Sequence, residues 1–260
     1  MTAQQHRDLV FPAEALGGAA AEAAYRRAGA VVFENVLTPD ALAALQRETD
    51  RLQTEAGGRP DAAIRLARRP TVDAQTIFER IDPVCDLSPP LAALAADPRL
   101  LAFAGRLIGG QPFLFKDKIN YKLPRDRGYL LHQDLPHLDG CEGMGAEMTV
   151  AVLCIDPLTD ENGGLTMYLG YHDDQLPAPP GNPRDVDPSA VDPARAWPIR
   201  TGAGSLLFFH ILTPHESGPN LSDRPRRLLF LDYTRVENAW TREVYYRARR
   251  RRIETEGVAY

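Results

Sequence analysis

The sequence predicts a mostly β fold with flanking helices, and three observations lead to this fold class. The N-terminal part carries apolar residues at helical spacing, whereas short runs rich in β-branched, aromatic and leucine residues follow from residue 111 onward. Helices followed by a series of strands are typical of a β-sandwich backed by a helical layer. A chain of 260 residues can form such a fold as one domain. We therefore expect a single domain over 1–260, with mainly helical support in 1–110, a β core in 111–236 and a C-terminal helix or tail in 237–260.

Two helices of the N-terminal part are marked by their first residues. Thr38 and Asp97 are suitable N-caps, and each is followed by a proline, whose missing N–H costs nothing at the first helical position. Leucine and alanine then recur every three or four residues, which gives each helix one apolar face. Glycine pairs at 57–58 and 109–110 can end the two helices.

The β core is predicted from strand-like segments separated by turn residues. These segments cover 112–123, 147–155, 164–169, 204–211 and 226–235. The stretch 175–198 differs from them, because it holds seven prolines and no apolar periodicity. It is expected to be an irregular insertion, a kind of loop that is often a lid or a disordered connector.

Composition excludes several classes of protein. A formal charge of −5 and a pI near 5.7 argue against a nucleic-acid binder. Three cysteines without CxxC spacing indicate neither a disulfide framework nor a zinc site. No apolar run approaches the ~18 residues of a membrane span, and the first residues do not resemble a signal peptide, so a cytoplasmic protein is expected. A basic run, Arg247–Arg252, is either a solvated helix face or a contact for an anionic substrate or a partner. Nothing indicates the oligomeric state.

The segment "LLHQDLPH" carries the first chemical signal. In an extended strand, His132 and Asp134 would point to the same face, which suits a metal ion or a histidine held by a carboxylate. A third ligand is available from His210 or His215, and Arg226 follows. Two histidines and one carboxylate on one face of a metal are typical of non-haem Fe(II) oxygenases.

The spacing after the third ligand adds an anion site to the prediction. An arginine fork can bind both oxygens of a carboxylate, and Ser217 could donate a hydroxyl to the same group. If the segments that begin at His215 and Arg226 form a hairpin, both residues would reach one cavity. His215 fits this spacing better than His210, which falls on the opposite face of a regular strand.

On these motifs the chain resembles the phytanoyl-CoA dioxygenase family of Fe(II)/2-oxoglutarate-dependent oxygenases, which includes ectoine hydroxylase. The resemblance runs from "AGAVVFENVLTPDALAAL" through "HQD" and "DENGGLTMYLGYHDD" to "HESGPNLSDRPRR". It implies a double-stranded β-helix, a cupin-like jelly roll, with an iron site and a 2-oxoglutarate site. The implied iron ligands are His132, Asp134 and His215, and the implied cosubstrate contacts are Arg226, Ser217, Gln133 and Asn120.

The resemblance implies an enzyme that uses Fe(II), O2 and 2-oxoglutarate as cosubstrate. The expected reaction is hydroxylation of a small organic molecule in bacterial secondary metabolism. Cyclisation, epimerisation or desaturation of a natural-product intermediate by the same cofactors stays open, as does a non-catalytic metal-binding jelly-roll protein. Halogenating relatives replace the carboxylate ligand with a small residue, so Asp134 argues against halogenation.

Several charged residues have two interpretations at this point. Arg80, Lys116, Lys118 and Lys122 could reach a charged substrate or could be solvated strand residues. His137 could be a pocket residue or a surface histidine. The identity of the substrate is not indicated.

Overall fold

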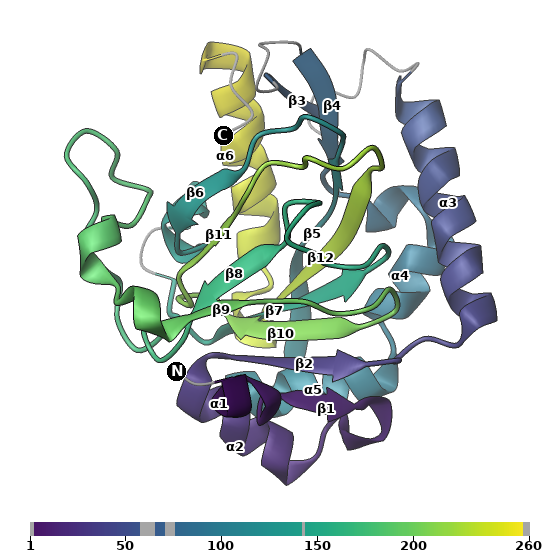
Figure 1. Cartoon of the computed structure of the whole chain (residues 1–260). Coiled ribbons are helices and arrows are strands. Elements are labelled where there is room, and N and C mark those ends of the chain that lie inside the picture. The colour runs from purple at the N-terminus through teal and green to yellow at the C-terminus, as the bar shows by residue number, and fades with distance from the viewer. Residues whose placement is uncertain (1–2, 58–65, 71–75, 142–143, 257–260) are drawn as a thin grey trace.

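Two β-sheets pack against each other at the centre of the computed structural model, which describes residues 3–57, 66–70, 76–141 and 144–256 (Figure 1). In the larger sheet the strand order is β1-β2-β10-β7-β12-β5-β4-β3, and in the smaller sheet it is β6-β11-β8-β9. All pairings except β1 with β2 are antiparallel. This is the jelly-roll arrangement that the sequence predicts.

The strands of the described residues are β1 (Val10–Pro12), β2 (Ala30–Glu34), β3 (Leu66–Pro70), β4 (Thr76–Ile81), β5 (Pro112–Lys122), β6 (Tyr129–His132), β7 (Met148–Cys154), β8 (Leu165–Tyr168), β9 (Ala196–Pro198), β10 (Leu206–His210), β11 (His215–Ser217) and β12 (Arg226–Arg235). The α-helices are α1 (Ala3–Arg7), α2 (Ala19–Ala28), α3 (Pro39–Gly57), α4 (Pro89–Ala95), α5 (Pro98–Ile108) and α6 (Thr241–Glu256).

Helices cover the face of the larger sheet that points away from the smaller sheet. At the centre of this layer, the Phe103 ring of α5 stands perpendicular to those of Phe33 and Phe208, with ring centres 5.4 and 5.0 Å apart. Edge-to-face packing of this kind stabilises a core beyond the apolar area it buries. The hydrophobic core lies largely between the helices and the larger sheet and continues to residues of the smaller sheet such as Leu165 and Met167.

Side chains of β5 and β12 alternate between these two environments. The hydroxyl of Tyr121 donates to the Thr49 carbonyl of α3 at 2.8 Å, and that of Tyr233 donates to the Ala95 carbonyl of α4 at 2.7 Å. Residues at the intervening positions face the smaller sheet, because successive side chains of a strand point to opposite faces. The same two strands thus hold the helices on one face and build a cavity wall on the other.

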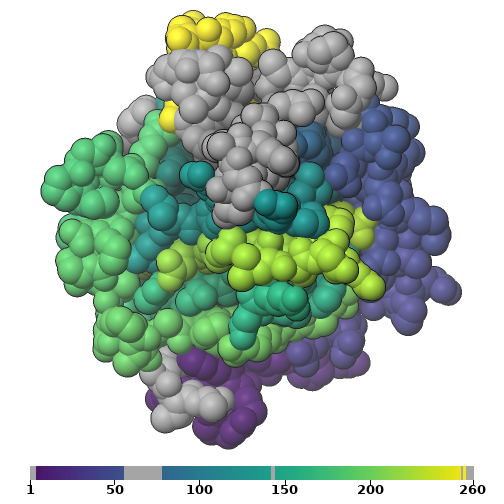
Figure 2. Space-filling view, turned by 45° about the horizontal axis from the view of Figure 1, so that its top comes forward, coloured from purple at the N-terminus to yellow at the C-terminus, as the bar shows by residue number. Residues whose placement is uncertain are grey.

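The two capped helices of the N-terminal part are confirmed as α3 and α5, and each of the five predicted strand segments contains a strand. The expected helical support is less uniform than predicted, since residues 1–110 also contribute β1 to β4 to the larger sheet. The insertion 175–198 is mostly irregular, but its last residues form β9 and pair with β8. Figure 2 shows this insertion as a green lobe at one edge of the molecule. Within the described residues, no helix has both the length and the apolar character to cross a membrane.

Candidate active site

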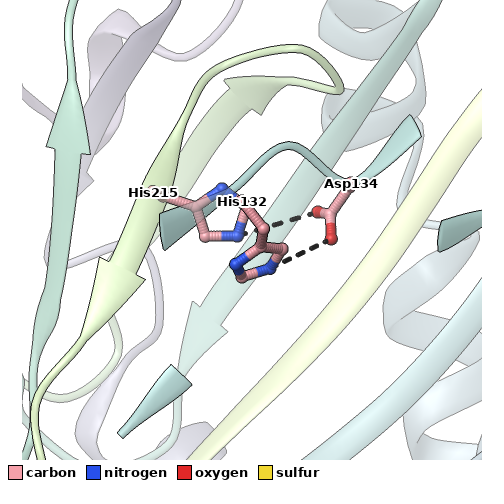
Figure 3. Close-up of side chains that lie close together, drawn as sticks. All are labelled: His132, Asp134 and His215. Atoms are coloured by element: carbon pink, nitrogen blue, oxygen red, sulfur yellow. Dashed lines mark ion pairs between the residues drawn. The ribbon is translucent and has the colours of Figure 1, made fainter. Parts of the chain in front are cut away.

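Two histidines and one aspartate converge at one end of the smaller sheet (Figure 3). His132 ends β6, His215 begins β11, and the two are partners in the antiparallel ladder, with ring centres 4.3 Å apart. The Asp134 carboxylate lies 3.7 Å from Nε2 of His132 and 3.9 Å from Nε2 of His215. The potential ligand atoms all lie within 4.8 Å of one another.

The route by which Asp134 reaches this point differs from the prediction. The strand ends at His132, and Asp134 has helical dihedrals, with φ −73° and ψ −30°. The two side chains therefore meet because the chain turns after β6 and not because they share a strand face. The backbone N–H of Asp134 donates to the Ile211 carbonyl at 3.1 Å, which fixes the turn against the segment that follows β10.

Both histidines are held in the tautomer that a metal ligand needs. Nδ1 of His132 lies 2.7 Å from the Leu130 carbonyl, and Nδ1 of His215 lies 3.0 Å from the Thr213 carbonyl. A carbonyl can only accept, so each Nδ1 carries the hydrogen and each Nε2 presents its lone pair. Backbone hydrogen bonds of this kind orient metal-ligating histidines in many proteins.

The charge states of the three groups also suit a cation. Burial lowers the pKa of His132 to about 4 and also lowers the pKa of His215, so both imidazoles are neutral near pH 7. Burial alone would raise the pKa of the Asp134 carboxyl, but His215, Lys116 and Lys118 hold that pKa well below its usual value. The set therefore offers two neutral nitrogen ligands and one carboxylate anion.

The structure does not bring Gln133 to the cavity. Its side chain is fully buried on the other side of the turn, where the amide nitrogen donates to the carbonyls of Asp174 and Leu212 at 2.9 and 2.6 Å. Its amide oxygen accepts from the N–H of Leu176 at 2.8 Å. Because all of these contacts are to backbone, Gln133 fixes the turn between the two candidate ligands. The expectation that it contacts the cosubstrate has no support in this geometry.

Arg226, Ser217 and Asn120 do line the same cavity as the triad. The predicted hairpin, however, does not form: His215 belongs to the smaller sheet and Arg226 begins β12 in the larger sheet. The connector crosses between the sheets, so the two residues reach the cavity from opposite walls. Arg226 is 2% exposed, one of its terminal nitrogens donates to the Gly163 carbonyl at 2.9 Å, and its Nε has no hydrogen-bond partner.

The polar groups around Arg226 are prepared for an anion. Oγ of Ser217 accepts from Nζ of Lys122 at 2.7 Å and from the N–H of Tyr129 at 3.3 Å, which leaves its own hydrogen to donate. Oδ1 of Asn120 is also buried without a hydrogen-bond partner; as an acceptor it suits a donor group of a ligand and not the anion itself. Buried polar atoms in folded proteins normally have partners, so an unpaired one in a cavity indicates a place for a ligand.

Lys122, for which the sequence left a substrate contact and a solvated strand residue both open, is a buried residue that supports the site. It is 2% exposed, and besides Ser217 it donates to the carbonyls of Gly163 and Gly218 at 3.3 and 2.6 Å. Gly163 has φ +69°, and a Cβ at this position would lie 2.5 Å from the Gly218 carbonyl oxygen. Only glycine allows this close approach. The Gly163 carbonyl accepts from both Lys122 and Arg226, and Lys122 also donates to Ser217, so this turn links Ser217 with Arg226.

The cavity has a volume of about 390 Å³. Its walls include His137, whose ring lies 5.3 Å from that of His132. His210 lies elsewhere, 5.4 Å from the ring of His172 and outside the lining of this cavity. The described basic residues along the walls, besides Arg226, are Arg80, Lys116, Lys118, Arg184, Arg249 and Arg252.

These basic residues resolve several open interpretations. Lys116 and Lys118 are not solvated strand residues: they share the inward face of β5 with Asn120, at positions two apart. The basic run near the C-terminus divides, because Arg249 and Arg252 line the cavity whereas Arg250 and Arg251 are exposed. Lys116, Lys118, Asn120 and Lys122 recur at every second position, and this spacing could have indicated from the sequence that they share one face of the strand. Which arginines of α6 face the cavity could not be predicted in the same way, because the rotation of the helix about its axis is set by its packing.

Comparison with known proteins identifies the family of the chain. The family model described as phytanoyl-CoA dioxygenase (PhyH) matches residues 25–228. A 2-aminoethylphosphonate dioxygenase from the uncultured bacterium HF130_AEPn_1 is 30% identical over 180 residues, which are 68% of this chain and 66% of that protein. A methylphosphonate hydroxylase from Gimesia maris is 35% identical over 157 residues, which are 59% of this chain and 58% of that protein. The alignments thus leave more than a third of each relative unmatched.

Solved structures share the fold. EctD from S. alaskensis with bound Fe superimposes with a TM-score of 0.70 and 23% identity, over 85% of this chain and 78% of that chain. The epimerase SnoN in complex with Fe3+, alpha ketoglutarate and nogalamycin RO gives a TM-score of 0.68 at 23% identity, over 86% of this chain and 83% of that chain. The jelly-roll fold predicted from the sequence is therefore confirmed.

Proposed function

The chain belongs to the phytanoyl-CoA dioxygenase family of Fe(II)- and 2-oxoglutarate-dependent oxygenases, and from this premise we propose that it hydroxylates a small organic molecule. The observation that carries the proposal is the triad, in which two imidazoles with fixed Nδ1–H groups turn their Nε2 lone pairs toward one carboxylate. This donor set fits a ferrous ion and leaves further coordination positions for other ligands.

His132, Asp134 and His215 would hold Fe(II), and Arg226 would hold the far carboxylate of 2-oxoglutarate. The guanidinium and the Ser217 hydroxyl both have unused hydrogens at the cavity that can donate to this carboxylate. Burial lowers the pKa of Arg226 to about 10, so this group keeps its positive charge near neutral pH. When bound, Fe(II) and 2-oxoglutarate supply the oxidising power, as O2 is consumed, succinate and CO2 are released, and an oxygen atom is inserted into a C–H bond of the substrate.

The chain itself contributes orientation and exclusion of water. The triad and Arg226 approach from opposite sheets, so a chelated cosubstrate would be fixed at both ends. A volume of about 390 Å³ lies near the lower end of the roughly 300–1,000 Å³ usual for ligand pockets, and the cosubstrate has to share it. The names of the two curated relatives describe small substrates as well. Both facts support a small substrate; a place in bacterial secondary metabolism stays a prediction.

Anaerobic addition of Fe(II) and 2-oxoglutarate to the purified protein tests the proposal. We expect a visible charge-transfer band from the chelated cosubstrate, and release of succinate once O2 is admitted. Asp134→Ala should lose both signals, whereas His210→Asn, a change at a half-buried histidine outside the cavity, should keep them. A non-catalytic metal-binding jelly roll would give neither band nor succinate in the unaltered protein, and that outcome would refute the proposal.

A further inference from the structure

One wall of the cavity is unusually basic for a protein with a net charge of −5. Its cations come from three elements that are distant in the sequence: Arg80 from β4, Lys116 and Lys118 from β5, and Arg249 and Arg252 from α6. Arg226, which serves the cosubstrate in the proposed function, is not part of this set. A cluster of cations that the chain gathers inside a cavity requires a compensating anion, because isolated buried charges are costly.

The carboxylates around this wall explain some of its cations and leave one unexplained. Lys116 forms an ion pair with Asp232 at 3.1 Å, which raises the pKa of this buried amine despite its desolvation. Lys118 has no such partner among the described residues: its Nζ lies 4.7 Å from the centre of the Phe230 ring and within ion-pair distance of no described carboxylate. Burial, followed by repulsion from Lys116, lowers the pKa of Lys118 to about 8. Asp134 and Asp232 act on Lys118 only beyond ion-pair distance, so an anion in the cavity would supply its direct counter-charge.

The C-terminal helix supplies the other half of the wall. Tyr245, Arg249 and Arg252 are spaced four and three residues apart, so they lie on one face of α6, and all three line the cavity. Arg249 is held by Asp82 at 3.4 Å and by the Tyr245 hydroxyl at 3.1 Å, and Arg252 by Asp139 at 3.3 Å. Asp139 also pairs with Arg184 at 2.5 Å. These contacts fix the guanidinium groups of Arg249 and Arg252 at the cavity, and both residues lie beyond residues 25–228, which the family model matches.

We infer that the substrate is a small organic anion with a tetrahedral oxyanion head group, a phosphonate or a phosphate monoester, bound between Lys118 of β5 and the arginines of α6. This inference rests on the proposed function, since the substrate has to lie beside the triad. Cations that reach one cavity from several directions match three oxygens around a tetrahedral centre, and arginine forks bind such oxygens in pairs. A planar carboxylate would use fewer of them, and a sulfonate, although tetrahedral, carries only one negative charge where a phosphonate or phosphate monoester can carry two.

Binding experiments with matched anions test the head group. The protein is loaded anaerobically with Fe(II) and saturating 2-oxoglutarate, so that Arg226 is occupied. It is then titrated calorimetrically with n-alkylphosphonates of one to four carbons and with the n-alkyl phosphates, sulfonates, carboxylates and alcohols of the same chain lengths. We expect phosphonates, phosphates or both to bind about tenfold or more tightly than the other analogues, a difference of about 1.4 kcal/mol. Faster release of succinate in their presence gives a second readout.

Three variants locate the binding site. Lys118→Met removes the ammonium and keeps its alkyl chain, and Arg252→Gln removes a cation whose partner Asp139 retains Arg184. Each should weaken binding of the preferred anion about tenfold or more, as loss of a charge-assisted hydrogen bond does. Arg250→Gln is the matched control, because this arginine lies on the same helix but is exposed. Thermal unfolding of each variant shows whether it folds.

The outcomes separate the inference from the proposed function. Equal or tighter binding of carboxylates, sulfonates or alcohols would overturn the inference, as would anion binding that Lys118→Met and Arg252→Gln leave unchanged. If Fe(II) and 2-oxoglutarate do not bind, the proposed function fails. Titration of the metal-free protein and of its Lys118→Met variant then still decides whether this wall binds phosphonates.

Discussion

Replacing Arg226 with lysine tests the cosubstrate end of the cavity. The guanidinium has one contact to the Gly163 carbonyl and an unpartnered Nε, so its remaining hydrogens can bind the far carboxylate of 2-oxoglutarate in a fork. Lysine keeps the charge and loses the fork, that is, about one charge-assisted hydrogen bond, worth roughly 1.5–3 kcal/mol. We therefore expect the Kd of 2-oxoglutarate to rise by about 10- to 100-fold. Arg226→Met also removes the charge, and truncation of a buried ion pair costs about 2–5 kcal/mol, so its effect should be larger.

The neighbouring Arg227 provides the control for this experiment. Its side chain points to the helical face, where it binds Asp156 at 2.8 Å and Thr49 of α3 at 3.0 Å. Arg227→Lys should lower the free energy of unfolding and leave the affinity for 2-oxoglutarate unchanged. Anaerobic calorimetric titration of the Fe(II)-loaded proteins gives the affinities, and urea unfolding gives the stabilities. An unchanged affinity for 2-oxoglutarate in Arg226→Lys would refute the assignment of Arg226 to the far carboxylate of 2-oxoglutarate. The same loss of affinity in both lysine variants would refute it as well.

Three further predictions concern residues that support the site. Gln133→Met should lower the melting temperature and weaken iron binding by about 10- to 100-fold, because the backbone contacts that fix the turn before Asp134 are lost. Metal titration measures the iron affinity, and thermal unfolding measures the melting temperature. Normal iron affinity in the variant would contradict this role of Gln133. Lys122→Met should destabilise the fold by about 2–3 kcal/mol, because the hydrogen bonds of the buried ammonium are lost. It should also raise the KM for 2-oxoglutarate, because the Ser217 hydroxyl is no longer held in place at the cavity. An unaltered KM would show that this lysine is only structural. Burial lowers the pKa of His210 to about 4 in the folded protein. The unfolded chain therefore binds a proton first as the pH falls from about 6.5 to 4, and up to about 3 kcal/mol of stability is lost in that window. His210→Asn should reduce the loss, as measured by urea unfolding at pH 4, 5 and 7, and an identical pH dependence in the variant would contradict it.

Much of the fold could be predicted from the sequence because its signals are local. Thr38 caps α3 by accepting from the N–H of Ala41, and Asp97 caps α5 by accepting from that of Arg99. The strands of the β core are short, apolar and bounded by turns, so their positions were also predictable. The strands of the first 110 residues were less visible, since β2 lies between two helices and gains its stability from pairing with β10, which is distant in the sequence.

The candidate site was predictable in its members and less so in its geometry. His132, Asp134 and His215 were identified by spacing, yet Asp134 reaches the others through a turn whose Gln133 anchors are not local. His215 and Arg226 were placed on one hairpin, because sequence spacing cannot show that the connector between two strands crosses to another sheet. The inward lysines of β5 were left undecided, since a charged residue on a strand has the same local pattern whether it faces solvent or a cavity.

The alternation along β5 and β12 explains how the fold and the site can be specified separately. Tyr121 and Tyr233 point to the helices, and their hydroxyls satisfy carbonyls at 2.8 and 2.7 Å. Lys118 and Phe230, which face each other across the same pair of strands, point into the cavity. A substitution at an inward position alters the charge or shape of the cavity without removing a helix contact. The arginines that α6 adds to the basic wall lie after residues 25–228, which the family model matches, whereas the triad, Arg226 and the wall residues of β4 and β5 lie within that range.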